Sequence, residues 1–411
     1  MDLSRRGLLT GLCAAPFLSL PRNIASAAMN GAPSPSLPDK ASFSVQGVYL
    51  DAAYAHPMSS IARSAYNEYM DRRTLTDRRI GPGYNARNAA VELFAKLINA
   101  NPTDIAVVPS TMEGENLVAA SLGIDRDTGV VTDALHYDAS IIMYGELAKH
   151  GVPVKVVAPR DGGIDLRDVE AAVSKSTRLV AVSLISNVTG FQHDLKALCE
   201  MAHSKGALVY ADIIQAAGAV PIDVKASGVD FCACGTYKWL MGDFGTAFLY
   251  VRPDRLQELK RVQIGWRQIK EQAADTFPFQ SAHEREDDWK LGSDTASIFE
   301  VSTPAWGALA CVAQSLQYIQ ALGVDRIVQY RRPLADRLRQ ELPKYGLKAL
   351  TPPGSDSPVL AFSYKGASRF AKPLRDAKIQ ISVYENRIRI SPSVYNDMDD
   401  VERLLRVLSA S

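Results

Sequence analysis

The sequence predicts an α/β protein with a mainly parallel β-sheet between helices and a smaller α+β part at the C-terminus. Strand-like and helix-like runs alternate between about residues 87 and 251, which is typical of βαβ units. At 411 residues and 47% hydrophobic composition, the chain has ample apolar material for a large core, and its length favours two domains. Lys and Arg number 46 against 45 Asp and Glu, so the net charge of +1 argues against a nucleic-acid binder.

The strand candidates of the predicted sheet are Val130–Thr132, Val154–Ala158, Leu179–Ile185, Leu208–Ala211, Phe231–Cys234 and Thr246–Val251. Helical patterns lie between them at Ser140–His150, Leu166–Lys175 and Leu195–Lys205. Strands that are apolar throughout are typical of parallel sheets buried on both faces. We therefore expect helices on both sides of the sheet.

The stretch 262–297 has no clear period and contains a charge run at 283–288. We expect a long loop there, either functional or mobile, with the charges on a solvated face. A helix over Ala305–Leu322 follows. Apolar runs at Val359–Ser363, Ile379–Val383 and Ile388–Ile390 and a final helix at Asp399–Leu408 then predict the small α+β lobe.

The N-terminus has the pattern of an export signal. Arg5 and Arg6 precede an apolar stretch that ends near Leu20, and small residues follow at 25–27. The paired arginines predict a twin-arginine signal, with an ordinary secretory signal or a plain helix as alternatives. We expect a signal peptide at 1–27, a leader or arm at 28–48, a large domain at 49–305, and a bridging helix with the small domain at 306–411. The predicted location is the bacterial periplasm, reached through the twin-arginine export machinery. No run approaches the roughly 18–20 apolar residues of a membrane helix.

Four cysteines follow the predicted signal: Cys199, Cys232, Cys234 and Cys311. Cys232 and Cys234 lie two apart in a strand-like run, with no second Cys or His pair nearby to complete a metal site. We expect free buried thiols and no metal.

Two polar groups follow neighbouring apolar strands. Asp212 ends the run from Leu208, and Lys238 follows the run from Phe231, a separation of 238 − 212 = 26 residues. Ligands of α/β sheets bind at the carboxyl ends of strands. A desolvated lysine and an acid there suit pyridoxal phosphate (PLP), whose aldehyde forms a Schiff base with the amine and whose ring nitrogen pairs with the acid. The alternatives are an Asp that caps a turn and a Lys that extends to the surface.

These and further motifs, from about Tyr49 to Asn396, resemble the class V aminotransferases. These are fold-type-I PLP enzymes that include cysteine desulfurases, isopenicillin N epimerase and kynureninase. The resemblance implies a seven-stranded sheet in the large domain. Asp212-Ile213-Ile214-Gln215 is similar to the D-x-x-Q element, which implies Asp212 on the pyridine nitrogen and Gln215 on the phenolic oxygen. Gly235-Thr236-Tyr237-Lys238 resembles the segment that ends in the Schiff-base lysine, with Thr236 and Tyr237 as cofactor contacts.

Further blocks occur in the same order as in the family. Ser110–Asn116 resembles a phosphate-binding turn at a helix start, which implies that Thr111 and Met112 bind the cofactor; a plain helix cap is the alternative. Ser186–Gly190 resembles S-N-x-x-G, which implies Asn187 as a contact of the cofactor and the substrate. In the 135–139 block we assign the ring-stacking role to Tyr137 and a peripheral one to His136.

Two motifs near the end complete the resemblance. Thr303 lies in a segment similar to G-T-P, whose threonine reaches the phosphate of the neighbouring subunit, and this implies a homodimer with shared active sites. Arg389 lies in a segment similar to R-x-S…Y-N, which implies that it binds the substrate carboxylate through a bidentate pair. Arg387, two positions away on the same strand face, is the alternative.

The departures from the family narrow the expected activity. No cysteine follows Cys311, so the nucleophilic cysteine of desulfurases is absent, and Ser302 replaces the usual glycine before Thr303.

Exported relatives include periplasmic enzymes that modify pyoverdine side chains. We expect an enzyme that acts on the α-amino group of an amino acid or a peptide-borne amino acid, most simply an aminotransferase. An epimerase, racemase or β-lyase of the same fold is the alternative, and a non-catalytic PLP-fold binding protein is the alternative from another class.

Overall fold

The computed structural model describes residues 35–75, 81–272 and 289–410. The predicted signal peptide and the charge run at 283–288 therefore lie outside the described residues. In the described part of the chain, no helix combines the length and the hydropathy that a membrane crossing requires. The remainder of the predicted leader, from Pro35 onward, packs on the body of the protein. Phe43 is buried there, and the Asp39 N–H donates to the Val394 carbonyl at 2.8 Å.

A seven-stranded sheet forms the centre of the large part, in the strand order β2-β8-β7-β6-β5-β3-β4. β8 alone runs in the direction opposite to the other six strands, so the predicted α/β fold with a mainly parallel sheet is confirmed. The strands are β2 (Ile105–Val108), β3 (Gly129–Asp133), β4 (Val154–Val157), β5 (Thr177–Ser183), β6 (Leu208–Asp212), β7 (Phe231–Gly235) and β8 (Ala247–Val251). Of these seven, β2 is the one that the sequence pattern did not predict.

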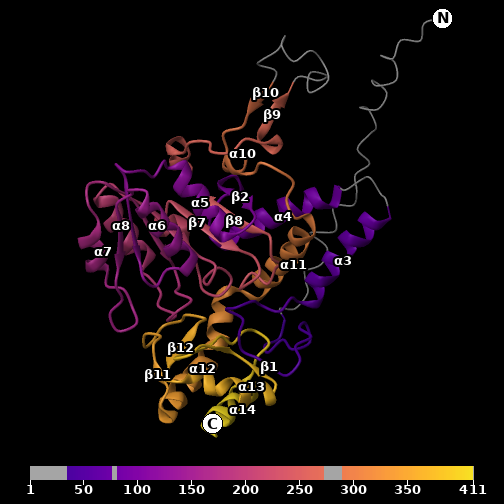
Figure 1. The fold of residues 1–411 in the computed structure, drawn as a ribbon. Helices are drawn as coiled ribbons and strands as arrows, with labels where there is room; N and C mark the ends of the chain where they lie inside the picture. Colours follow the sequence, from indigo (N-terminus) through magenta and orange to yellow (C-terminus); the bar gives the residue numbers. More distant parts are fainter. Residues whose placement is uncertain (1–34, 76–80, 273–288, 411) are drawn as a thin grey trace, which may run out of the picture. The chain divides into compact units, whose positions relative to one another are not determined.

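Side chains of this sheet alternate between two apolar cores, as the two-residue strand period requires. In β6, Leu208 and Tyr210 belong to one core and Val209 and Ala211 to the other. The first core is covered by α5 (Thr111–Ser121), α6 (Asp138–Lys149) and α10 (Thr295–Phe299). The second is covered by α4 (Gly81–Leu97), α7 (Leu166–Ala172), α8 (Leu195–Ser204), α9 (Val224–Ser227) and α11 (Trp306–Leu322). Figure 1 shows α4 and α11 side by side, with α3 (Ser60–Thr74) against them.

The C-terminal part has its own core and a four-stranded antiparallel sheet, in the order β11-β12-β15-β14. Its elements are β11 (Lys348–Ala349), β12 (Leu360–Ser363), β14 (Ser382–Val383), β15 (Arg387–Ile390), α12 (Val324–Glu341), α13 (Ala371–Asp376) and α14 (Met398–Ser409). Val48 and Leu50 join this core from the other end of the chain, where β1 (Val48–Tyr49) pairs in parallel with β13 (Ile379–Gln380). The bridging helix α11 contributes its buried side chains to the core of the large part, not to that of the C-terminal part. The domain boundary at 306 therefore stays a prediction.

The stretch expected to be one long loop contains regular structure. The strands β9 (Ile269–Gln272) and β10 (Trp289–Leu291) form an antiparallel ribbon, which Figure 1 shows extending beyond the large sheet. The expectation was wrong here because the two strands are short and pair across an intervening segment, so no local periodicity marks them. Short 3₁₀ turns complete the fold at Pro102–Asp104, Pro253–Glu258, Trp266–Gln268, Leu342–Tyr345 and Ala367–Phe370.

Candidate active site

Asp212 and Lys238 lie at the same edge of the sheet, around one cavity of about 160 Å³. Asp212 is the last residue of β6, and Lys238 follows the adjacent parallel strand β7 after a short turn. Both side chains are buried, with exposures of 4% and 8%. The fold therefore brings together the acid and the lysine that the sequence predicts as partners.

Burial dominates the electrostatics of this pair. Desolvation raises the pKa of Asp212 to about 6. The Ile214 N–H, which donates to Oδ1 at 2.9 Å, acts in the opposite direction and lowers this pKa. Desolvation lowers the pKa of Lys238 to about 8, although the negative charge of Asp212 by itself raises this pKa. A lysine with this pKa has a substantial neutral fraction near pH 7–8, which a nucleophilic amine requires.

The N-terminus of α5 forms another wall of the cavity. Ser110 is the N-cap and accepts a hydrogen bond from the Glu113 N–H, while the Thr111 hydroxyl accepts one from the Gly235 N–H at 2.8 Å. The backbone N–H groups of Thr111 and Met112 lie in the first turn, where no intrahelical acceptor exists. These groups, together with the positive end of the helix dipole, make this wall suitable for an anion.

Tyr137, Asn187 and Tyr237 line the remaining sides of the cavity. The Tyr237 ring stacks on Phe244 with centroids 4.4 Å apart, and burial raises its pKa to about 12, so its hydroxyl stays protonated. Asn187 lies in a turn that requires glycine at position 190. There φ is +75°, and a Cβ would lie 2.1 Å from the carbonyl oxygen of Val359.

Arg389 lies beside the Asn187 turn and is held from several sides. Its Nη1 donates to the Asn187 carbonyl at 3.3 Å, and its Nη2 donates to the Ser382 hydroxyl at 3.0 Å and lies 3.5 Å from Asp51 Oδ1. Arg387 instead donates to the Val188 carbonyl at 2.5 Å and lies over the Tyr384 ring. Arg389 is the more buried of the two, at 3% exposure.

Three predicted contacts make other interactions within this chain, and their roles toward the cofactor stay predictions. The Thr236 hydroxyl donates to the Asp243 carbonyl at 2.5 Å and does not line the cavity. Gln215 lines it, but its Nε2 donates to the Ala53 carbonyl and its Oε1 accepts from the indole of Trp239. Thr303 lines a separate cavity of about 640 Å³. Hydroxyl and amide side chains such as these occur both in cofactor sites and in bonds that stabilise loops, so sequence alone does not separate the two roles.

Several residues around the site were not predicted. Ser183, Ile185 and Ile214 line the cavity because they lie at or just after the C-terminal ends of β5 and β6. Asp51, which contacts Arg389, follows the short strand β1 and pairs with Ser391 in an isolated bridge. An acid directly after an apolar pair is the only local signal for Asp51, and it does not indicate a partner 338 positions away.

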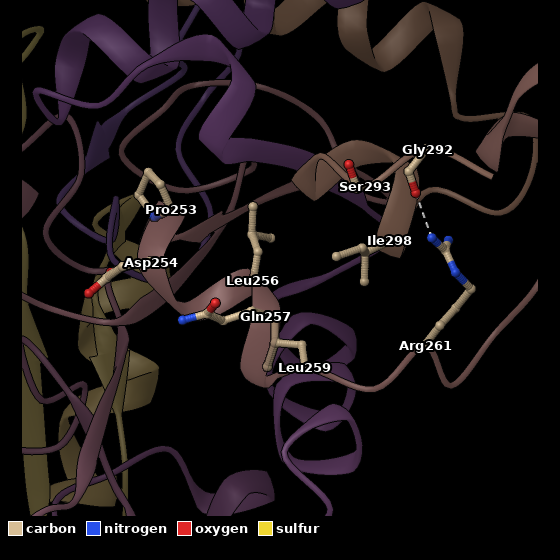
Figure 2. A pocket seen from close by; sticks show the side chains of 9 residues that line it. All are labelled: Pro253, Asp254, Leu256, Gln257, Leu259, Arg261, Gly292, Ser293 and Ile298. Carbon is tan, nitrogen blue, oxygen red and sulfur yellow. Dashed lines mark hydrogen bonds between the residues drawn. The ribbon is translucent and has the colours of Figure 1, made fainter. Parts of the chain in front are cut away.

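Larger cavities lie elsewhere, and none of those described is lined by Lys238 or Asp212. Figure 2 shows one of about 500 Å³, in which Arg261 donates to the Gly292 carbonyl at 2.7 Å. Its other titratable side chain, Asp254, is bound to Arg252. We therefore assign the active site to the smaller cavity that contains Lys238.

The side chains at this cavity fit PLP. In the described part of the chain, Asn187 Oδ1 and Arg389 Nε are buried polar atoms without a hydrogen-bond partner, so both can bond a ligand. The first turn of α5 offers N–H groups to a phosphate, Asp212 offers a carboxylate to a ring nitrogen, and Lys238 offers an amine to an aldehyde.

Comparisons with known proteins point the same way. A family model described as aminotransferase class-V matches residues 83–404. A Bacillus subtilis protein described as the uncharacterized aminotransferase YcbU is 30% identical over 360 residues, which cover 87% of this chain and 92% of the relative. A probable cysteine desulfurase of Methanothermobacter thermautotrophicus is 28% identical over 323 residues, covering 77% and 78% of the two chains.

Solved structures share the fold. The apo cysteine desulfurase of Thermococcus onnurineus NA1 superposes with a TM-score of 0.80 at 24% identity, covering 92% of this chain and 99% of its own. The cystine C-S lyase C-DES gives a TM-score of 0.79 at 18% identity, covering 89% and 98%. The predicted architecture thus has experimentally determined counterparts.

Proposed function

Because this chain belongs to the class-V aminotransferase family and is a PLP-dependent enzyme, we propose that it transfers the α-amino group of an amino acid or a peptide-borne amino acid. The observation that carries the proposal is the single cavity bordered by Lys238, Asp212 and the N-terminus of α5, with Arg389 at its margin. This arrangement supplies an amine, a counter-charge for a heterocycle, an anion site and a carboxylate receptor within one site.

When bound, PLP supplies an aldehyde that condenses with amines and a ring that withdraws electrons from the substrate Cα. Arg389 holds the substrate carboxylate, and its unpaired Nε is a donor available for that contact. The neutral Nζ of Lys238 would be the base that takes the Cα proton. Asp212 would present its carboxylate to the ring nitrogen, and Tyr137 would cover a face of the ring.

The cysteines of the described residues do not support desulfurase chemistry. Cys199, Cys232, Cys234 and Cys311 are free and buried, and burial raises the pKa of all four thiols. A thiolate nucleophile requires a lowered pKa and access to substrate. We infer that an amino-group reaction, and not sulfur transfer from cysteine, is the activity of this site.

The test is to incubate the purified holoenzyme with defined pools of amino acids and to follow the cofactor spectrum, the keto acids and Cα proton exchange. Release of a keto acid with conversion of the cofactor to its amino form supports transamination. Exchange of the Cα proton with inversion and no keto acid supports an epimerase, and elimination products support a β-lyase. No spectral change with any pool contradicts an amino-acid substrate and favours a binding protein.

We further propose that the protein works in the bacterial periplasm after export in folded form. The support is the Arg5-Arg6 pair with the apolar stretch and small residues that follow it, all outside the described residues. Export of a folded chain suits an enzyme whose cofactor is inserted before translocation. Changing both arginines to lysine is expected to retain the protein in the cytoplasm of a bacterial host, and cell fractionation measures it. Unchanged export would contradict the twin-arginine route.

We also propose a homodimer with shared active sites. The support is that Thr303 resembles a phosphate-contacting threonine yet lies at a different cavity from Lys238 within one chain. The inactive variants Lys238→Ala and Thr303→Val are expected to recover part of the activity when unfolded and refolded together. A monomer in sedimentation equilibrium, or no recovery on mixing, would contradict this proposal.

A further inference from the structure

We propose that Glu115 and His136 form a buried charged pair behind the active site that keeps Asp212 ionised, with Ser183 linking the pair to the cavity. The inference rests on the PLP assignment, and it concerns residues that do not touch the cavity themselves. Glu115 and His136 are thus positioning residues, and the peripheral role expected for His136 becomes an electrostatic one.

The pair is part of a continuous chain of hydrogen bonds. Ser140 Oγ donates to Glu115 Oε2 at 2.6 Å, and His136 Nε2 donates to Glu115 Oε1 at 3.0 Å. On the other side of the imidazole, Nδ1 lies 2.8 Å from Ser183 Oγ. Glu115 and His136 are 1% and 0% exposed, so water does not screen this interaction.

Ser183 connects this chain to the site. It is the last residue of β5, lines the cavity, and is the register partner of Asp212 on β6. Register partners on neighbouring parallel strands point to the same face of the sheet. The two side chains therefore face the cavity together, one bonded to His136 and one expected at the ring nitrogen.

The charge of His136 decides what Ser183 offers to the cavity. Because Nε2 must carry a proton to bond the carboxylate of Glu115, a neutral ring leaves Nδ1 as an acceptor that takes the Ser183 hydroxyl proton. In the imidazolium, Nδ1–H donates to Ser183 Oγ instead, so the hydroxyl proton is free for an acceptor in the cavity. The imidazolium also places a positive charge near the Asp212 carboxylate.

The surroundings favour the imidazolium. Burial by itself lowers the pKa of His136, but the negative charges of Glu115, Asp212 and Asp133 outweigh it and raise the pKa above the ordinary 6.5. In return, the positive charge of His136 opposes the burial that raises the pKa of Asp212, and Lys238 acts in the same direction. The titratable groups that face the pair are Asp133, Asp212, Tyr144 and Tyr210.

The experiment uses the holoenzyme labelled with ¹⁵N-histidine and records the imidazole nitrogens between about pH 5 and 9. The signal of His136 is assigned by its loss in His136→Gln. We expect it to remain that of an imidazolium well above pH 6.5 in the wild type, and to become that of a neutral ring at neutral pH in Glu115→Gln. A neutral His136 in the wild type at pH 7 would overturn the proposal, and this readout does not depend on turnover.

The second measurement is the dissociation constant of PLP from each variant. His136→Gln keeps an amide that can bond both neighbours but leaves the Glu115 charge unpaired, so we expect about tenfold weaker binding, equivalent to about 1.4 kcal/mol. The double variant Glu115→Gln/His136→Gln removes both charges and should recover part of that loss.

His193→Gln is the matched control. His193 is another buried histidine, 3.1 Å from the carboxylate of Asp133, but it has no bond to a residue of the cavity. We expect its PLP affinity to remain within about twofold of the wild type, a difference near RT ln 2. Equal losses in His193→Gln and His136→Gln would show a general packing effect and would overturn the proposal.

Discussion

The lowered pKa of Lys238 leads to a quantitative prediction about the apoprotein. With a pKa of about 8 instead of the ordinary 10.5, the neutral amine makes up about a tenth of Lys238 at pH 7, against roughly three in ten thousand for an unperturbed lysine. The difference is about 300-fold in nucleophile concentration. It corresponds to a cost of about 3 kcal/mol for holding the ammonium form in the cavity.

Competitive labelling of the apoprotein with acetic anhydride measures this pKa. Only the neutral amine reacts, so the modified fraction of the Lys238 peptide, followed by mass spectrometry against a small amine standard, should rise with a midpoint near pH 8. Asp212→Asn removes the strongest attraction for the ammonium form and should move the midpoint to lower pH. A midpoint near pH 10.5, or an upward move in Asp212→Asn, would refute the electrostatic reasoning.

Three other predictions follow from the same geometry. Below pH 8, Lys238 is protonated in both the folded and the unfolded apoprotein, so the buried charge lowers the folding stability by its full amount. This loss of stability is relieved as the pH rises from 8 toward 10.5, where the folded protein releases the proton first. The apoprotein of Lys238→Met should therefore be more stable at pH 7 by about 1–3 kcal/mol in urea unfolding, and lower stability would contradict this. Arg389→Lys keeps the charge but loses the planar fork, so KM should rise about tenfold or more, whereas Arg387→Lys should change KM much less; equal effects would remove the preference for Arg389. Asp51→Asn removes the acid near Arg389, and we expect KM to rise about threefold to tenfold with little change in kcat, measured in the same steady-state assay; an unchanged KM would show that Arg389 needs no such support.

Much of the large domain was predictable because its signals are local. A run such as Leu208–Asp212 is apolar throughout and ends in an acid, and both features survive in the structure as β6 with its terminal carboxylate. The strand β2 was missed because its four residues lie directly after a 3₁₀ turn, too short to show a period. Its position at the sheet edge is set by pairing with β8, about 140 residues later in the chain.

The sequence predicts site residues where a reactive or charged side chain follows the end of a strand. It does not predict contacts that depend on pairing between segments far apart in the chain. Lys238 and Asp212 meet because adjacent parallel strands end at the same edge. The distinction between Tyr137 and His136 at the cavity follows from the turn before α6, which buries the His136 ring and exposes the Tyr137 ring. Asp51 reaches Arg389 only because the N-terminal segment pairs with the C-terminal part.

The contacts of Arg389 with Asp51 and of His136 with Glu115 have the same physical effect on the site. Arg389 and, under the proposal above, His136 are cations buried at or behind the site, and each lies beside a carboxylate, Asp51 for one and Glu115 for the other. A buried unpaired cation is costly, and it would also attract any anion in the cavity without selectivity. With a carboxylate behind it, each cation keeps a fixed orientation and acts through directed hydrogen bonds. Asp51 and Glu115, to which the motifs assign no role, therefore allow Arg389 and His136 to carry their charges in an interior with little water.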